Sequence, residues 1–130
     1  MNAAPACAVK VKTPGGHYDI HIAAGLLNNA AAWQGLPAAT HAVIVTNPTV
    51  DALYGAQLQA AIAPQYRQVS RLLLPDGEVH KTWASLNLVF DHLLAHACDR
   101  KTVLYALGGG VVGDMTGFAA ATYMRGVPFV

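Results

Sequence analysis

A run of glycines between two apolar segments is the part of this sequence best suited to chemistry. Gly108, Gly109 and Gly110 follow the apolar run 102–107 and precede the alanine-rich segment 115–124. A strand, a glycine turn and a helix in this order place unpaired backbone N–H groups and the positive end of a helix at one edge of a sheet. Because glycine has no Cβ, a bulky anion can lie directly against such a turn. The pattern therefore favours a phosphate or diphosphate ligand.

Other interpretations of the same stretch stay open from the residues alone. The glycines could form a tight strand-to-helix turn that binds nothing, and Gly113 and Gly117 could serve close helix packing. The spacing is not the GxGxxG of the dinucleotide-binding fingerprint. Asp114 is expected in the first helical turn, where the helix dipole favours a carboxylate even without a ligand.

An α/β framework is predicted to position the glycine turn. Residues 8–12 and 17–22 alternate apolar and polar positions around a Pro-Gly-Gly turn, as the strands of an antiparallel hairpin do. Buried parallel strands are expected at 41–46, 66–74 and 102–107, with another starting at 127–130, and helices at 25–33, 50–63, 83–96 and 115–124. Thr49 and Thr82 are the expected N-caps of the second and third helices. The expected fold is a Rossmann-like, mostly parallel sheet with helices on both faces, preceded by the hairpin.

Polar residues follow three of the predicted parallel strands. Asn47 comes after the first strand, Asp76, Gly77, Glu78 and Lys81 after the second, and the glycine triplet with Asp114 after the third. The carboxyl ends of parallel strands meet at one edge of the sheet, where α/β proteins bind ligands. We therefore expect these residues to converge on one crevice.

Two groups of histidines have spacings that metal sites use. His17, Asp19 and His21 alternate along a predicted strand, while His92 and His96 are one helical turn apart. The helical pair lacks the glutamate of an HExxH site, and both groups are expected on solvent-facing surfaces. On a helical wheel the apolar face comprises Trp83, Leu86, Phe90, Leu93, Leu94 and Ala97, with Ser85, His92 and His96 opposite. We interpret the histidines as solvated and expect no metal ligands.

The composition indicates one apolar α/β domain. Of the 130 residues 54% are hydrophobic and 12% are charged, against about 25% charged in typical domains. With so few charged residues, part of the surface is expected to be apolar. This indicates either that a partner covers it or that the chain is part of something larger. The net charge of +1 and the lack of a basic cluster give no case for nucleic acid. Cys7 and Cys98 match no metal or redox spacing, and no secretion signal or spanning segment is apparent, so a soluble cytoplasmic protein is expected.

Several motifs resemble the 3-dehydroquinate synthase family. LPDGEVHK at 74–81 and ALGGGVVGDMTGFAAATYMRG at 106–126 carry the resemblance, with VTN at 45–47 in register upstream. It implies that 1–130 is an N-terminal NAD-binding domain, incomplete without a C-terminal helical domain that holds the metal and substrate. The cofactor-binding residues that it implies are Asn47, Asp76, Gly77, Glu78, Lys81, Gly109, Gly110, Val111, Val112, Gly113 and Asp114.

The resemblance also implies individual roles. Asn47 would contact the adenosine side of NAD, Glu78 the ribose hydroxyls and Asp114 the nicotinamide end, with pyrophosphate contacts from the backbone of 109–111. Arg125 would bind the phosphorylated substrate, across a dimer interface or within one chain. Its alternative is a cation favoured by the dipole at a helix C-terminus.

The reaction implied by the resemblance belongs to the shikimate pathway of aromatic amino acid biosynthesis. It converts 3-deoxy-D-arabino-heptulosonate 7-phosphate into 3-dehydroquinate and phosphate, with NAD as a transient oxidant and a divalent metal, zinc or cobalt, as Lewis acid. The metal ligands of the family, a glutamate and two histidines, belong to the later domain. We therefore expect no catalytic and no metal-binding residue in this chain, which should be inactive alone, marginally stable or self-associating. The full-length enzyme is expected to be a homodimer.

Three alternatives remain open beside this function. Another sugar-phosphate cyclase, making an inosose or a valiolone, would share the cofactor, metal and fold. An iron-type alcohol or glycerol dehydrogenase would release NADH in net turnover, which the cyclase would not. A non-catalytic NAD-binding module is the third.

Overall fold

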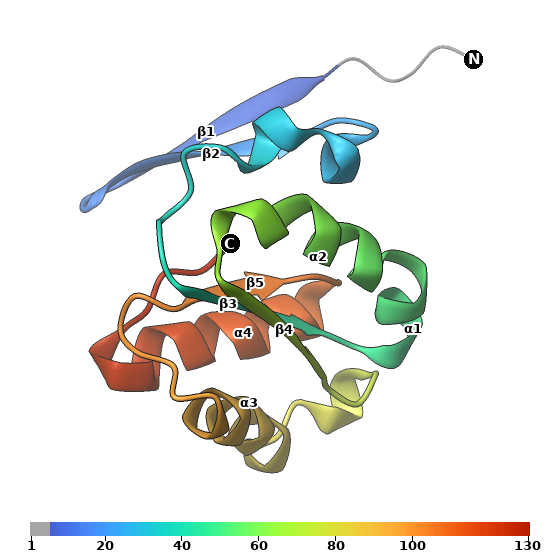
Figure 1. Ribbon diagram of the computed structural model, residues 1–130, viewed down its shortest axis with the longest axis vertical. Coiled ribbons are helices and arrows are strands. Elements are labelled where there is room, and N and C mark those ends of the chain that lie inside the picture. Colours follow the sequence, from blue (N-terminus) through green and yellow to red (C-terminus); the bar gives the residue numbers. More distant parts are fainter. Residues whose placement is uncertain (1–5) are drawn as a thin grey trace.

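The computed structural model describes residues 6–130, which form a parallel sheet covered by helices on both faces and a separate antiparallel hairpin (Figure 1). The strands are β1 (Cys7–Thr13), β2 (Gly16–Ile22), β3 (His41–Thr46), β4 (Gln68–Leu73) and β5 (Val103–Ala106). The helices are α1 (Pro48–Val50), α2 (Ala56–Ile62), α3 (Trp83–Ala95) and α4 (Gly110–Thr122). A π-helical segment, Asp51–Gly55, joins α1 to α2.

The order of the parallel strands is β4-β3-β5. The chain leaves β3 through α2 to reach β4 on one side, and later passes through α3 to reach β5 on the other side. The topological switch point, where α/β sheets bind ligands, thus lies between the carboxyl ends of β3 and β5. The predicted strand at 127–130 starts to form beside β5, since the Val130 N–H donates to the Leu104 carbonyl at 2.8 Å. Phe129 forms a parallel bridge with Leu104.

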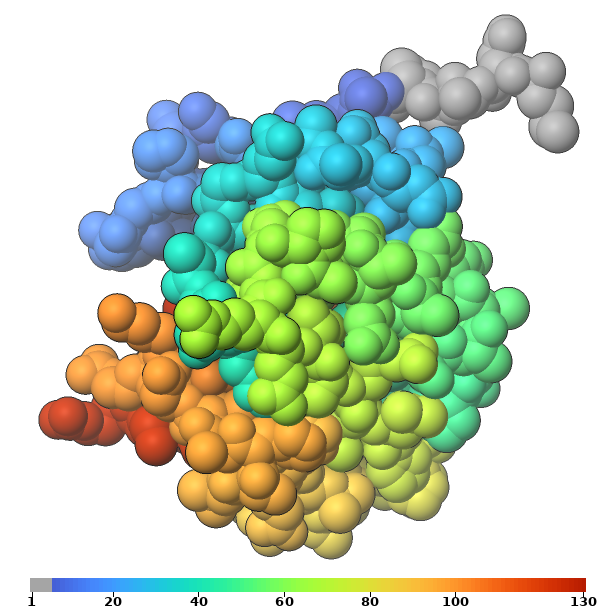
Figure 2. All heavy atoms as spheres, viewed as in Figure 1, coloured from blue at the N-terminus to red at the C-terminus, as the bar shows by residue number. Residues whose placement is uncertain are grey.

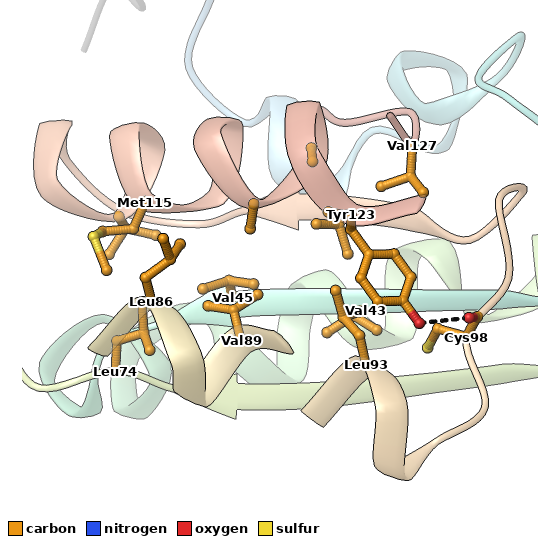
Figure 3. Close-up of a cluster of buried hydrophobic side chains, with 14 residues drawn as sticks. Val43, Val45, Leu74, Leu86, Val89, Leu93, Cys98, Met115, Tyr123 and Val127 are labelled. Carbon is orange, nitrogen blue, oxygen red and sulfur yellow. Dashed lines mark hydrogen bonds between the residues drawn. The ribbon is translucent and has the colours of Figure 1, made fainter. Parts of the chain in front are cut away.

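Each face of the sheet has its own apolar core, because successive side chains of a strand point to opposite faces. Val43 and Val45 of β3 pack with α3 and α4, and Tyr123 closes this core by donating its hydroxyl to the Cys98 carbonyl at 2.7 Å (Figure 3). Ile44 packs on the other face toward α2. The apolar run 41–46 is buried throughout, which confirms the prediction of a central strand.

The hairpin stands apart from this three-layer body. Strands β1 and β2 pair in antiparallel register, with Val9 opposite Ile20. Figure 2 shows the hairpin in blue at one end of the molecule, beyond the short turns in cyan that cover α2. These turns, Leu26–Asn28 and Ala30–Trp33, are 3-10 segments, so the single helix predicted for 25–33 is wrong. Asn29 interrupts it, because its side chain caps the second turn by accepting from the Ala31 N–H at 3.1 Å.

Two predicted helix starts also differ from the structure. Asn47, and not Thr49, caps α1 by accepting from the Val50 N–H at 2.9 Å. Pro48 therefore occupies the first helical position, where its missing N–H costs nothing. Helix α4 begins at Gly110 instead of 115, so Asp114 lies in its second turn.

The helical wheel predicted for α3 is only partly correct. Leu86, Val89 and Leu93 are buried, but Trp83 and Leu94 are 70% and 63% exposed. The reason is geometric: α3 packs against both the sheet and α4, so its buried stripe lies between these two contacts. The predicted cap at Thr82 is confirmed, since its Oγ1 accepts from the Ser85 N–H at 3.2 Å and brings Ser85 into the buried face. Among residues 6–130, none of the helices has the length and apolar character needed to cross a membrane.

Candidate functional site

The glycine turn after β5 presents an uncapped helix N-terminus. Gly109 is the N-cap of α4 and no side chain caps this end. The N–H groups of Gly110, Val111 and Val112 occupy the first three helical positions, where an α-helix offers them no intrahelical acceptor. A Cβ at Gly109 or Gly110 would meet nothing within 4 Å. An anion can therefore approach these N–H groups from open space, and the helix dipole favours it.

Two further glycines in this stretch have different environments. Gly108 has a φ of +156°, and a Cβ there would lie 3.0 Å from Cγ2 of Val112. A side chain at Gly108 would thus press on the core beneath the turn. Gly113 is open to solvent on its Cα side, but its N–H already donates to the Gly109 carbonyl at 3.0 Å. Its N–H is therefore not free for a ligand.

A lysine links the loop after β4 to α4. The Lys81 ammonium donates to Oδ2 of Asp114 at 2.7 Å and lies 3.6 Å from Oε1 of Glu78. The hydrogen bond that Lys81 donates to Asp114 raises the pKa of Lys81 above its usual value. Gly77 makes this approach possible, because its φ of +109° turns the chain into the 3-10 segment Glu78–His80. The structure thus brings together Glu78, Lys81 and Asp114, which are far apart in sequence.

Asn47 joins the loops after β3 and β4. Its side-chain oxygen is occupied in capping α1, and its Nδ2 donates to Oδ1 of Asp76 at 3.4 Å. Thr49 donates to the other oxygen of Asp76 at 3.3 Å. Asn47 itself is buried, whereas Asp76 is exposed. The two predicted site residues are therefore neighbours, and Asp76 is the one that faces solvent.

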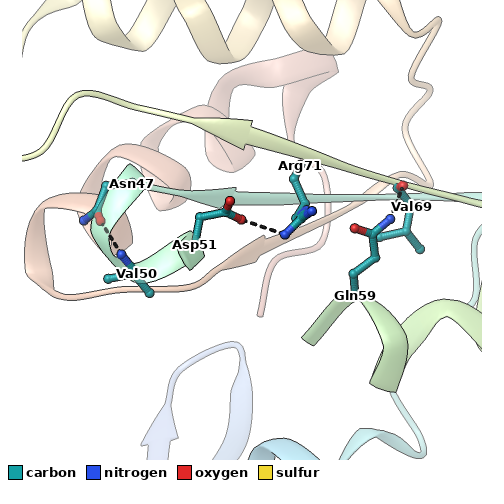
Figure 4. A network of polar contacts seen from close by, with 6 residues as sticks. All are labelled: Asn47, Val50, Asp51, Gln59, Val69 and Arg71. Atoms are coloured by element: carbon teal, nitrogen blue, oxygen red, sulfur yellow. Dashed lines mark hydrogen bonds and ion pairs between the residues drawn. The ribbon is translucent and has the colours of Figure 1, made fainter. Parts of the chain in front are cut away.

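An ion pair that the sequence did not reveal fixes the segment after Asn47. Arg71 of β4 donates to Oδ1 of Asp51 at 2.9 Å, and Gln59 of α2 donates to the Val69 carbonyl at 3.2 Å (Figure 4). Both contacts tie the segment between β3 and β4 back onto β4. Asn47 is consequently held from both sides, by its own cap and by the Asp51–Arg71 pair.

A cavity of about 320 Å³ adjoins the Lys81–Asp114 pair, between the start of α3 and the first turns of α4. Its lining residues are Lys81, Thr82, Trp83, Leu86, Asp114, Met115 and Phe118. Trp83 and Phe118 meet edge to face, with ring centroids 5.7 Å apart. The sequence predictions missed these aromatic residues, because Trp83 was assigned to the apolar face of its helix and Phe118 was given no role. A signal was present, since Trp83 lies two residues after Lys81, the last residue of the DGEVHK segment.

Arg125 does not join this site within the chain. It lies in the 3-10 segment Tyr123–Arg125 that follows α4, at the opposite end from Gly110. The thirteen residues of α4 span roughly 20 Å at 1.5 Å per residue. The backbone of Arg125 therefore lies far from the glycine turn of its own chain. The role across a dimer interface stays a prediction.

The histidines occupy two places away from the glycine turn. His17, Asp19 and His21 are exposed on the hairpin. His92 is half-buried, and its Nε2 lies 2.9 Å from the hydroxyl of Ser70. The prediction of a solvated His92–His96 pair is therefore wrong for His92. Within residues 6–130, no three His, Cys, Asp or Glu side chains group in a way that could hold a metal ion.

Sequence comparison finds similarity to proteins of one family. The family model described as the 3-dehydroquinate synthase N-terminal domain matches residues 71–130. The 3-dehydroquinate synthases of Bordetella pertussis and Bordetella bronchiseptica are each 58% identical over 123 residues, which is 94% of this chain and 34% of the relative. The chain thus spans about a third of the length of the curated relatives that it matches.

Structure comparison finds the same fold in related cyclases. A crystal structure of 2-deoxy-scyllo-inosose synthase complexed with carbaglucose-6-phosphate, NAD+ and Co2+ has a TM-score of 0.83 at 17% identity, covering 95% of this chain and 34% of that one. ValA, the 2-epi-5-epi-valiolone synthase from Streptomyces hygroscopicus subsp. jinggangensis 5008 with NAD+ and Zn2+ bound, has a TM-score of 0.65 at 34% identity, covering 81% and 29%. The predicted fold class is confirmed. In sequence, residues 71–130 match the model of the 3-dehydroquinate synthase N-terminal domain.

Proposed function

We propose that this chain is the NAD-binding part of a 3-dehydroquinate synthase. The observation that carries the proposal is the uncapped N-terminus of α4, which lies at the switch point of the sheet with open space over Gly109 and Gly110. A diphosphate carries the charge that such a helix end attracts. The family match of residues 71–130, which contain this turn, supports NAD as the molecule that brings it.

The residues around the turn fit the rest of a dinucleotide. The diphosphate would accept hydrogen bonds from the N–H groups of Gly110, Val111 and Val112. Asp76 and Glu78 present exposed carboxylates that can accept from ribose hydroxyls. In this proposal the adenosine side lies toward Asn47, and the nicotinamide end lies toward Asp114 and the adjoining cavity.

The chemistry that NAD supplies when bound is transient hydride acceptance. In the proposed reaction 3-deoxy-D-arabino-heptulosonate 7-phosphate becomes 3-dehydroquinate and phosphate. The residues of this chain bind and orient the cofactor, and the cavity walls of Trp83 and Phe118 would keep water from one side of it. The Lys81–Asp114 pair holds the loop after β4 against α4 while the cofactor is in place.

The metal of the reaction is proposed to bind outside this chain. Two structurally similar cyclases have Co2+ or Zn2+ bound beside NAD+, which supports a divalent metal, zinc or cobalt, in the whole enzyme. The donor groups among residues 6–130 do not fit such an ion, because no three of them group together. We therefore propose that 1–130 is an N-terminal domain, inactive alone. Its metal ligands, and the substrate ligands other than Arg125, would belong to the part of the relatives that it does not match.

Two further properties belong to the same proposal. We place the protein in the cytoplasm, which agrees with cysteines Cys7 and Cys98 that are both free. We also propose a homodimer, in which Arg125 reaches the substrate phosphate of the partner subunit. The exposed apolar side chains of Tyr18, Ile20 and Ile22 on the hairpin support a surface that a second copy covers.

A valiolone-forming cyclase is the second candidate, favoured by the 34% identity to ValA. The two activities differ in substrate and product but share the NAD site proposed here. Supplying the whole enzyme with 3-deoxy-D-arabino-heptulosonate 7-phosphate decides between them. Formation of 3-dehydroquinate supports the first candidate, while turnover only of a sugar phosphate without the carboxylate supports the second.

Calorimetry of NAD binding tests the site itself. The wild-type chain and two variants are each titrated with NAD. Gly110→Val fills the open space over the turn, and Gly15→Val is a matched change in the hairpin turn, where a Cβ also meets nothing within 4 Å. Saturable binding that is lost only in Gly110→Val supports the proposal. A folded wild-type chain that binds no NAD, or equal binding by all three proteins, contradicts it. Phosphate release from the substrate by this chain alone would contradict the assignment of catalysis to another domain.

A further inference from the structure

A chain of polar side chains crosses the end of the sheet opposite to the glycine turn. His41 begins β3, and its Nε2 lies 3.0 Å from the hydroxyl of Ser70 on β4. The same hydroxyl lies 2.9 Å from Nε2 of His92 on α3. At the other side of the His41 ring, Nδ1 lies 3.4 Å from the thiol sulfur of Cys98. His96 stacks on His92, with ring centroids 4.0 Å apart.

The donors and acceptors of this hydrogen-bonded network balance only when both rings are neutral or when one of the two rings is positively charged. A serine hydroxyl donates one hydrogen and accepts others. With both rings neutral, Cys98 donates to His41, His41 donates to Ser70, and Ser70 donates to His92, or the direction is reversed throughout. A proton on His92 makes its Nε2 a donor, and the reversed direction then satisfies every group.

A second proton breaks this balance. With His41 and His92 both charged, two N–H groups point at the oxygen of Ser70, whose own hydrogen has no ring nitrogen left to accept it. Two positive charges then also face each other across one hydroxyl, in a region where His41 is 6% exposed. Charged groups in such surroundings are unfavourable unless an opposite charge compensates them.

The neighbouring elements supply little compensation. His96 of α3 faces both rings and disfavours their charge, while Asp99 favours a charge on His41. Oδ1 of Asp99 already accepts from the N–H groups of Lys101 and Thr102, at 2.9 and 3.1 Å. Tyr123, beyond α4, contributes a neutral hydroxyl that is occupied with the Cys98 carbonyl. Burial therefore dominates, lowering the pKa of His41 and lowering the pKa of His92 to about 4.

We propose that His41, Ser70 and His92 form a proton-sensitive latch between the sheet and the C-terminal end of α3, including the turn at Cys98. The hydrogen bonds of the latch hold while at most one of the two rings is charged, and they break when both are charged. The latch goes beyond NAD binding, since it joins β3, β4 and α3 at the edge of the sheet that the cofactor does not touch. Because the two rings bind protons more weakly in the folded protein than in the unfolded chain, the stability that the latch contributes is present above pH 6.5 and is lost as the pH falls toward 4.

Nuclear magnetic resonance of the imidazole nitrogens tests the proton logic. In the wild-type chain, protonation of His92 removes the arrangement in which Ser70 donates to this ring. The tautomer populations of His41 are therefore expected to shift in the same step. In Ser70→Ala, which removes only the shared hydroxyl, the same step should vanish from the His41 signals. Independent tautomer changes of the two rings in the wild type, or coupling that persists in Ser70→Ala, would overturn the proposal.

Unfolding by urea at several pH values tests the energetic consequence. His92→Gln keeps a hydrogen-bonding group but cannot be charged, and His17→Gln makes the same change on the exposed hairpin. Between pH 7.5 and 4.5 the folding equilibrium constant of the wild type should fall about tenfold more than that of His92→Gln, allowing for solvent access to a half-buried ring. His17→Gln should follow the wild type. Identical pH profiles of wild type and His92→Gln would refute the latch.

Discussion

Gly55 occupies a position where a single methyl group should break an ion pair. A Cβ built there would lie 2.6 Å from Nη1 of Arg71 and 2.8 Å from Cγ of Asp51, with the Asp51 carboxylate oxygen closer still. The Asp51 side chain is short, so it must leave its rotamer to make room. The Gly55→Ala change therefore acts mainly through the Asp51–Arg71 contact at 2.9 Å.

The size of the effect follows from three contributions. The pair is partly buried, with side-chain exposures of 31% and 20%, and a hydrogen bond between charged groups in such a place contributes about 2 kcal/mol. Forcing Asp51 off its rotamer costs about 1 kcal/mol. Alanine offsets about 1 kcal/mol of this, because it is a better helix former than glycine. The net expectation is a loss of about 2 kcal/mol in the free energy of unfolding.

A double-mutant cycle in urea, followed by circular dichroism, checks this reasoning. In the Asp51→Ala background the clashing carboxylate is gone, and the flexible Arg71 side chain can move aside. Gly55→Ala should then stabilise the protein by about 1 kcal/mol, so that its sign reverses. An equal destabilisation in both backgrounds would refute the assignment of the effect to the ion pair.

Three other changes test single contacts of the structure. Thr82→Ala should lower the free energy of unfolding by about 1 kcal/mol through loss of the α3 cap, and a urea titration with an unchanged midpoint would contradict this. Tyr105→Phe removes a buried hydroxyl 2.7 Å from that of Tyr66 and should cost about 1 kcal/mol, whereas a neutral result would mean that the pair adds nothing. Asp114→Asn should lower the pKa of Lys81 toward its ordinary value, because the hydrogen bond that raises it is weakened; an unchanged Lys81 signal in a nitrogen-detected titration would show that the contact does not persist in solution.

Local signals in the sequence were sufficient to predict most elements. The run 41–46 is apolar and β-branched, and this composition suits only a buried strand, which β3 is. The alternation around Pro-Gly-Gly predicted the hairpin, and the Thr82 cap sits directly before its helix. In each case the residues that define the element lie within it or directly beside it in sequence. The rule that strand ends meet at one edge further predicted that the polar residues after the strands converge, and in the structure Asn47 neighbours Asp76 and Lys81 neighbours Asp114.

Other features depended on contacts between distant segments. Asn47 and Thr49 both suit an N-cap, and it is Asn47 that caps α1 while Thr49 bonds to Asp76 from another loop. The glycines before α4 have poor intrinsic helix propensity, so the early start at Gly110 had no local signal. Packing of Val112 and Met115 into the core supports that first turn.

In the candidate site and in the latch, too, some features follow from the local sequence and others depend on contacts between distant segments. The sequence by itself determined which residue types reach the carboxyl edge of the sheet, because strand boundaries follow from local composition. Only the tertiary structure decided that Trp83 and Phe118 form a cavity wall, and that Ser70 bridges His41 and His92. The spacing of apolar residues along α3 does not fix the rotation of this helix about its own axis closely enough to say which side chains are buried. That rotation is set by how α3 packs against both the sheet and α4.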